Sequence, residues 1–244
     1  MTVGTCAELG LRMAGPILRR GQCAALQHDR ESPTHAFLAF SALAVLAAQP
    51  PDSWLGGLDQ ALSARVAASR TAAAVRVSKA ASAAAEPALA AIPLVTSAAI
   101  ASRRSGWPAG FVPCLTVLAG MAVRRGLSQA IARPRPPAEI WLAEPSGFSL
   151  PSRHTCLAAL TVGTCARALG SKRAASQGAA MLAGAAVGAS RVCLGVHWPT
   201  DVLAGWLFAA GWLGLAELAP PSAWRPVSPS PLGPGMLARR WRHQ

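Results

Sequence analysis

The chain has 244 residues, a length that suits one domain or one compact membrane bundle. Hydrophobic residues make up 52% of it and charged residues only 14%, whereas soluble proteins carry about a quarter charged residues. The formal charge of +13 would fit a nucleic-acid-binding protein, but the cations lie in short joints, in the C-terminal tail and in three short motifs. We therefore expect a membrane protein with no nucleic-acid partner.

Apolar blocks separated by short polar joints dominate the chain after a polar lead. Residues 1–35 carry scattered charge, which predicts a partly ordered cytoplasmic lead without a cleaved signal peptide. Several of the blocks that follow are shorter than the roughly 20 residues of a spanning helix, yet so many of them are hard to reconcile with a soluble core. The blocks, in chain order, are 36–49, 89–102, 111–123, 155–168, 174–190 and 202–219.

Three parts of the chain lack the clear pattern of a spanning helix. Block 36–49 is the weakest candidate for a span and could be a buried or interfacial helix. Residues 53–86 are alanine-rich with scattered cations, which suits an amphipathic helix on a surface or a solvated linker helix. Residues 220–244 are basic and rich in proline, serine and glycine, and we expect them to be disordered. The prediction is an all-α integral membrane bundle over 36–219, with about six transmembrane helices, or five if the first block does not span.

Three motifs hold the polar residues that are best suited to chemistry. Together they supply two histidines, one carboxylate and several guanidiniums, a set that suits phosphoryl transfer without a metal. Arginine suits such a site because its planar fork meets phosphate oxygens two at a time. The motifs are Arg-Pro-Arg-Pro at 133–136, Pro-Ser-Arg-His-Thr at 151–155, and Ser190-Arg191 followed by His197 and Asp201.

The third motif carries a histidine and a carboxylate at helical spacing. His197 and Asp201 lie four residues apart across a helix start, so the carboxylate can reach one ring nitrogen and leave the other free to attack. Taken alone, this pair is more typical of a histidine that caps a helix beside an aspartate. The Ser190-Arg191 pair at a fixed distance before it favours a reactive histidine.

The three motifs resemble the signature of the type 2 phosphatidic acid phosphatase and vanadium haloperoxidase superfamily, over about residues 120–215. That signature is Lys-x6-Arg-Pro, then Pro-Ser-Gly-His, then Ser-Arg-x5-His-x3-Asp, and the third motif matches it at every fixed position. Arg153 replaces the glycine of the second motif, and Ser128 stands in place of the lysine of the first. Arg125, one helical turn before Ser128, or Arg124 could replace that lysine, or both could lie at the membrane interface.

The resemblance implies a role for each matching residue. His197 would be the nucleophile that forms a phosphohistidine, Asp201 would orient it, and His154 would be the general acid. Arg133 could contact phosphate, or it could be a solvated or headgroup-contacting arginine. No metal and no other cofactor is expected, because arginines supply the positive charge. The expected phosphate-binding residues are Arg135, Ser152, Arg153, Ser190, Arg191, Arg125 and Ser128.

The distribution of cations predicts an orientation in the membrane. With six crossings and the N-terminus inside, the joints at 103–104 and 171–173 and the basic tail lie inside, and the three motifs meet at the outer face. The resemblance then implies a plasma (inner) membrane phosphatase that hydrolyses a lipid phosphate monoester or diphosphate, of polyprenyl or glycerolipid type, among membrane lipids. Two alternatives stay open: a vanadate-dependent haloperoxidase-like enzyme, and a catalytically weakened lipid-binding or assembly protein, which the serine at 128 suggests. The sequence predicts no oligomeric state.

Overall fold

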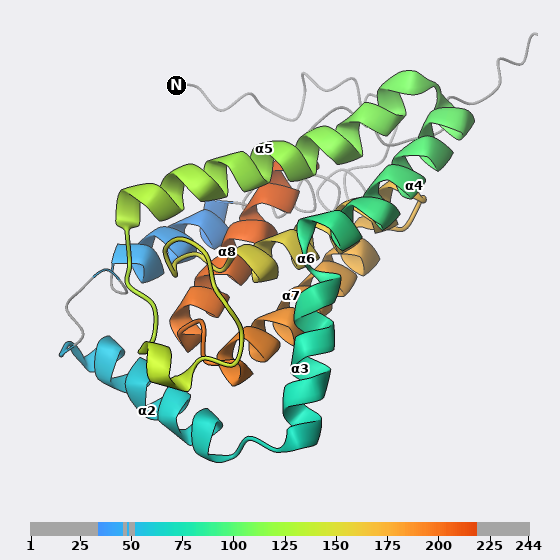
Figure 1. Ribbon diagram of the computed structural model, residues 1–244. Helices are drawn as coiled ribbons and strands as arrows, with labels where there is room; N and C mark the ends of the chain where they lie inside the picture. Colours follow the sequence, from blue (N-terminus) through green and yellow to red (C-terminus); the bar gives the residue numbers. More distant parts are fainter. Residues whose placement is uncertain (1–33, 46–47, 49–51, 219–244) are drawn as a thin grey trace, which may run out of the picture.

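The computed structural model describes residues 34–45, 48 and 52–218, and these residues form helices and no β-strand (Figure 1). The predicted tail at 220–244 and nearly all of the predicted lead at 1–35 lie outside the described residues. The helices are Thr34–Val45, α2 (Trp54–Ala68), α3 (Ala72–Ala84), α4 (Pro87–Ser105), α5 (Trp107–Ile131), the short 3₁₀ turn η2 (Ala138–Ile140), α6 (Arg153–Ala168), α7 (Arg173–Cys193) and α8 (Pro199–Ala216).

Proline and glycine determine where these helices begin and end. Pro87 and Pro199 stand in the first turn of α4 and α8, where a missing N–H costs no hydrogen bond. Gly106 has a φ of +86° in the joint between α4 and α5, a conformation that glycine adopts without strain. The five apolar blocks after residue 86 coincide with α4 to α8, so the sequence placed these helices correctly.

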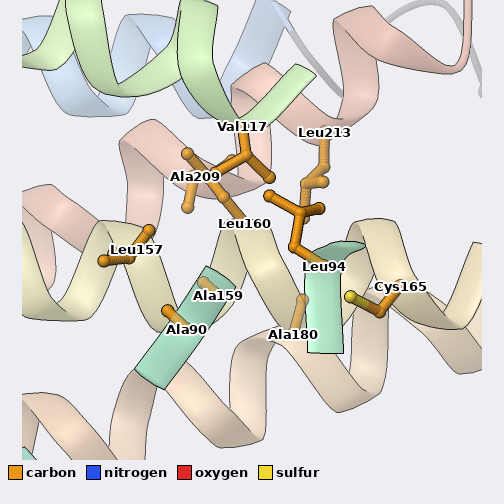
Figure 2. Packing of buried hydrophobic residues seen from close by; sticks show 10 residues of the cluster. All are labelled: Ala90, Leu94, Val117, Leu157, Ala159, Leu160, Cys165, Ala180, Ala209 and Leu213. Atoms are coloured by element: carbon orange, nitrogen blue, oxygen red, sulfur yellow. The ribbon is translucent and has the colours of Figure 1, made fainter. Parts of the chain in front are cut away.

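Helix α6 is the centre of the bundle, and α4, α5, α7 and α8 all pack against it. Small side chains let these helices approach closely. A Cβ at Gly163 would lie 2.8 Å from Leu213 Cδ1, and one at Gly188 would overlap Val202. Figure 2 shows the resulting core, to which α4, α5, α6, α7 and α8 each contribute one to four side chains. Its members are Ala90, Leu94, Val117, Leu157, Ala159, Leu160, Cys165, Ala180, Ala209 and Leu213.

The helix Thr34–Val45 packs against α8 rather than standing apart from the bundle. The ring centroids of Phe37 and Phe40 lie 6.3 Å and 5.7 Å from that of Phe208, in edge-on arrangements. A helix over these residues rises about 18 Å at about 1.5 Å per residue, less than the roughly 30 Å of a bilayer core. Its length therefore favours the alternative in which block 36–49 is a buried or interfacial helix.

Judged by length and apolarity, fewer helices could cross the membrane than the six that we predict. Among the described helices, Ala109–Ile131 is long and apolar enough to span, and the pair Ala72–Ala84 and Pro87–Ser105, bent by 52°, would add a second if it forms one span. The other helices are too short or too polar for these criteria, although the positions of α6, α7 and α8 match the predicted blocks. The all-helical architecture is confirmed, and the helix count across the membrane is not.

Residues 53–86 form neither a single surface helix nor a solvated linker. They form α2 and α3, and α3 packs along α7 while α2 lies near the ends of α7 and α8 (Figure 1). Asp59 of α2 and Ser82 of α3 are buried, at 1% and 6% exposure. Glu86 follows in the break before α4. This segment therefore contributes polar side chains to the interior.

Candidate active site

The three motifs lie at one end of the bundle. The first follows the C-terminus of α5, the second opens α6, and the third joins the C-terminus of α7 to the N-terminus of α8. Hydrogen bonds connect them directly: the Ser152 N–H donates to the Asp201 carbonyl at 3.0 Å, and Arg133 reaches the Asp201 carboxylate. The joint between α4 and α5 and the joint between α6 and α7 fall at the other ends of these helices.

His197 and Asp201 form a buried pair. Nδ1 of His197 lies 3.3 Å from Oδ2 of Asp201, and the two residues are 1% and 0% exposed. The same carboxylate oxygen accepts a hydrogen bond from the Trp198 N–H at 2.9 Å, which fixes its position. Burial lowers the pKa of His197 to about 4, against the opposing influence of Asp201. The ring is therefore neutral at pH 7, with Nδ1–H directed at the carboxylate and the lone pair on Nε2.

Arg133 is buried and paired with carboxylates rather than solvated. It is 9% exposed, and its guanidinium bridges two carboxylates: Nη1 lies 2.6 Å from Oδ1 of Asp201, and Nη2 lies 2.8 Å from Oδ2 of Asp59. Thr200 joins the same network through its N–H, which donates to Asp59 Oδ1 at 3.0 Å. Arg133 therefore holds Asp201, and through it His197, in position from the side away from the ring.

Arg135 lies beside the free nitrogen of His197. Its Nη1 is 3.1 Å from Nε2 of His197 and donates to the Val196 carbonyl at 2.6 Å. Its Nε and Nη2 donate to the carbonyls of residues 146–148 at 2.8 to 3.0 Å. Burial lowers the pKa of Arg135 to about 10, so it stays cationic at pH 7. Arg135 therefore places a positive charge beside the lone pair on Nε2 of His197, where an anionic phosphoryl group would bind.

The second motif places an N-terminal helix turn at the site. Ser152 precedes α6 and is fully buried, and its side chain makes no capping hydrogen bond to the helix. Its hydroxyl accepts a hydrogen bond from Thr155 at 3.0 Å instead. The first backbone N–H groups of α6 therefore keep their capacity to donate to an anion, which the helix dipole also favours.

His154 contacts a carboxylate that comes from outside the three motifs. Its Nε2 lies 2.7 Å from Oε1 of Glu86, and Arg153 Nη2 lies 3.2 Å from Oε2 of the same residue. Glu86 is the N-cap of α4, yet its side chain makes no capping bond. Burial alone would raise the pKa of Glu86, but the hydrogen bond with His154 and the charges of His154 and Arg153 outweigh it and lower that pKa. Glu86 is therefore negatively charged where it contacts His154 and Arg153.

Ser190 and Arg191 occupy the last turn of α7 and are both buried. The Ser190 hydroxyl donates to the Val187 carbonyl at 2.6 Å, which keeps it on its own helix. Arg191 donates from Nη1 to the Ser82 hydroxyl of α3, and its Nε has no hydrogen-bond partner in the described part of the chain. A buried guanidinium N–H without a partner costs free energy, and an anion at the site would satisfy it.

Arg124, and not Arg125, contacts Ser128. The Arg124 guanidinium donates to the Ser128 hydroxyl at 3.3 Å and from Nε to the Pro151 carbonyl at 2.8 Å, and Arg124 is 8% exposed. Arg125 is exposed on the adjacent face of α5. At the position where the family signature has a lysine, this chain has Ser128. The positive charge there comes from Arg124, a buried residue one helical turn earlier.

Comparison with known proteins gives one family match. Residues 109–224 of this chain, a range that contains all three motifs, match the model of the PAP2 superfamily. Among curated proteins no match is found.

A solved PAP2 structure has the same fold. It is the crystal structure of a transmembrane PAP2-type phosphatidylglycerolphosphate phosphatase from Bacillus subtilis, which is 24% identical and superposes with a TM-score of 0.67. The similarity covers 77% of this chain and 94% of the solved one. It therefore extends beyond the family match and includes helices before α5.

Three residues at the site lie outside the sequence motifs and outside the range of the family match. Asp59, Ser82 and Glu86 all lie before the family motifs, in the segment expected to be a surface or linker helix. One local signal could have drawn attention to two of them: Asp59 and Glu86 are the two carboxylates within residues 53–86. Nothing in the local pattern indicates that they face Arg133 and His154.

Proposed function

We propose that this protein is a membrane phosphatase that hydrolyses a lipid phosphate monoester or diphosphate through a phosphohistidine on His197. The observation that carries the proposal is the environment of the His197 ring. Asp201 lies at Nδ1, Arg135 lies at Nε2, and burial keeps the ring neutral. A neutral imidazole with an oriented lone pair and an adjacent guanidinium is suited to attack on phosphorus.

The first step forms a bond between Nε2 of His197 and phosphorus and breaks the bond from phosphorus to the leaving oxygen. His154 donates a proton to that oxygen, so the alcohol or the lower phosphate leaves neutral or singly charged. Arg135, Arg191, the Ser152 hydroxyl and the first N–H groups of α6 stabilise the charge on the equatorial oxygens. Asp201 balances the positive charge that develops on His197.

The second step returns the enzyme to its starting state. His154, now neutral, takes a proton from water, and the hydroxide forms a bond to phosphorus as the bond to Nε2 breaks. Inorganic phosphate leaves. Glu86 supports both steps because its carboxylate stabilises the protonated form of His154 before the first step and again after the second. We assign Glu86 the part of a positioning residue.

A lipid substrate is favoured by the outer surface of α4 and α5. Large apolar side chains are exposed along both helices, far more than a few isolated residues. Such a surface suits contact with acyl or prenyl chains, and the substrate would reach the site from the bilayer. The structurally similar solved protein is a phosphatidylglycerolphosphate phosphatase, which supports lipid phosphates as the substrate class. The exposed residues include Leu89 (49%), Ile92 (61%), Val95 (61%), Phe111 (65%), Leu115 (66%) and Leu118 (66%).

The test is turnover by purified protein in detergent with excess EDTA. We expect phosphate release from a short-chain lipid phosphate, and a labelled, acid-labile phosphoenzyme after rapid quenching. His197→Ala should abolish both, whereas His35→Ala, an exposed histidine on the first helix, should leave both at the wild-type level. Substantial hydrolysis by His197→Ala would reject the phosphohistidine. Bromination with added vanadate in a protein without phosphatase activity would reject the proposed reaction.

A further inference from the structure

Helix α2 buries polar side chains against the bundle and exposes large apolar ones. Asp59 and Ser63 are 1% and 5% exposed. Trp54, Leu58 and Leu62, which are also spaced by four residues and therefore share a face, are exposed by 71%, 45% and 39%. A helix on a water-exposed surface has the opposite arrangement, with its polar residues outward. A row of three large apolar side chains is therefore a surface that contacts something other than water.

The position of α2 favours the bilayer as that partner. The helix packs against the ends of α7 and α8 (Figure 1). Leu203, in the second turn of α8, is 45% exposed, so the apolar outer surface of the bundle extends to the end where α2 lies. Tryptophan is enriched at the boundary between membrane and water, and Trp54 begins the exposed row.

The charge of this region is complementary to anionic lipid. Within Trp54–Ala68 the one carboxylate is that of Asp59, which is buried and paired with Arg133. Arg65 of α2 is exposed, and α3 adds the exposed cations Arg76 and Lys79. A helix that combines an apolar face with exposed cations is typical of binding to a membrane surface that carries anionic headgroups.

The buried side of α2 reaches the catalytic pair. Oδ2 of Asp59 lies 2.8 Å from Nη2 of Arg133, and Nη1 of Arg133 lies 2.6 Å from Oδ1 of Asp201, the carboxylate beside His197. The Thr200 N–H also donates to Asp59 Oδ1 at 3.0 Å. One helix therefore exposes an apolar row on one side and holds the network behind the nucleophile with another.

We infer that α2 binds the bilayer surface through Trp54, Leu58 and Leu62, and that this contact keeps Asp59 in place behind the catalytic pair. The partner is the boundary between headgroups and acyl chains, in the leaflet at the motif end of the bundle. The contact stands apart from the proposed function, whereas its effect on turnover rests on that function. Asp59 and α2 are then positioning elements, and the site is in its productive geometry when lipid covers α2.

Quenching of tryptophan emission in nanodiscs tests the contact. The probes are phosphatidylcholines with bromine on the acyl chain, either near the headgroup or near the chain end. The emission lost in Trp54→Phe isolates the signal of Trp54, and we expect the shallow bromine to quench that signal more than the deep one. The same subtraction for Trp141, half-buried with its Nε1 donating to the Pro136 carbonyl, should show no such quenching.

Two results would overturn the contact. If iodide in the water quenches Trp54 and neither bromine does, the face is in water. If neither iodide nor bromine quenches Trp54, a second copy of the chain or another protein covers the face. Neither measurement needs turnover, so a protein without phosphatase activity would reject the proposed function and leave this test intact.

Turnover of p-nitrophenyl phosphate in nanodiscs tests the effect on the site, because this soluble substrate needs no lipid-binding surface. The double variant Leu58→Gln/Leu62→Gln should lower kcat roughly tenfold with little change in KM, since a small displacement of the catalytic pair misaligns the nucleophile. Leu58→Met/Leu62→Met keeps the face apolar and should keep the wild-type kcat. Leu142→Gln, an exposed leucine in the connection between α5 and α6, is the matched control and should also keep it.

An Asp59→Asn background separates this link from a general loss of stability. With the link already cut, the two glutamines should lower kcat no further, because coupled residues do not act additively. An equal further loss in that background would overturn the effect on the site. So would an unchanged kcat in the glutamine variant of the wild-type chain.

Discussion

Glu86 Oε1 lies 2.7 Å from Nε2 of His154, although 68 residues separate them along the chain. The carboxylate comes from the break between α3 and α4, where two helices meet at 52°. A negative charge at this distance favours the protonated imidazole, which a general acid must be at the start of the reaction.

Glu86→Gln should therefore weaken His154 as a general acid while leaving a hydrogen-bonding side chain in place. We expect the basic limb of the kcat profile to move to lower pH by about one unit, because one adjacent charge typically has an effect of this size. The loss should be larger for an alkyl phosphate than for p-nitrophenyl phosphate, whose leaving group needs no proton. The measurement is kcat against pH for both substrates.

The control for this experiment is Glu144→Gln, which removes an exposed carboxylate from the connection between α5 and α6. It should leave the basic limb in place. A Glu86→Gln enzyme with an unshifted profile, or with equal losses on both substrates, would show that Glu86 only stabilises the fold.

Asp59→Asn tests the buried network behind His197. Arg133 bridges Asp59 and Asp201, and all three are at most 9% exposed. Removing one partner of a buried ion pair typically costs about 3 to 5 kcal/mol, because the other charge is left uncompensated. We expect a clear drop in Tm in detergent and a lower kcat, since Arg133, which holds Asp201, then loses its second carboxylate partner. The exposed Asp52→Asn is the control, and an unchanged Tm in Asp59→Asn would contradict the network.

The burial of His197 has a consequence for the pH dependence of activity. An ordinary histidine has a pKa of 6.5, whereas burial lowers the pKa of His197 to about 4. The neutral, nucleophilic form therefore persists as pH falls from 6.5 towards 4, and the acid limb of kcat/KM should lie below pH 5. Below pH 6.5 the unfolded chain takes up a proton that the folded chain refuses, so the contribution of His197 to stability declines from pH 6.5 to about 4.

That profile must be corrected for the substrate, because a phosphate monoester has its own second ionisation at about pH 6. An acid limb centred near 6.5 after this correction would mean that His197 titrates like an exposed histidine. The free energy of unfolding, measured over the same pH range, provides an independent check.

Arg124→Gln tests the replacement of the family lysine. We expect a loss of about 100-fold in kcat/KM on a lipid monophosphate, the usual effect of removing one transition-state donor. Ser128→Lys in this background should recover part of it, because it restores a cation at the family position. Arg125→Gln should cost less on this substrate, since it is Arg124 that hydrogen-bonds Ser128. No rescue by Ser128→Lys would mean that Arg124 matters for its bond to the Pro151 carbonyl.

Local signals were enough to predict the helices and the order of the motifs. The apolar blocks that became α4 to α8 are long runs with few charges, and Pro199 and Gly106 mark helix boundaries through their own backbone geometry. The spacing of His197 and Asp201 is four residues on a helix start, so their contact follows from helix geometry alone. The number of spans could not be predicted in the same way, because alanine and glycine serve equally in a buried helix and in a membrane.

Tertiary structure decided which side chains meet across the bundle. Arg124 and Arg125 are neighbours in sequence but about 100° apart around α5, so only the rotation of that helix against α6 determines which one reaches Ser128. Arg133 becomes a bridge between two carboxylates only because α2 brings Asp59 beside α8. The sequence by itself thus determined the helices and the reactive pair, since both depend on near neighbours. The partners of His154, Arg133 and Arg191 depend on contacts between residues 67 to 109 positions apart, and only the packing of the folded chain creates these.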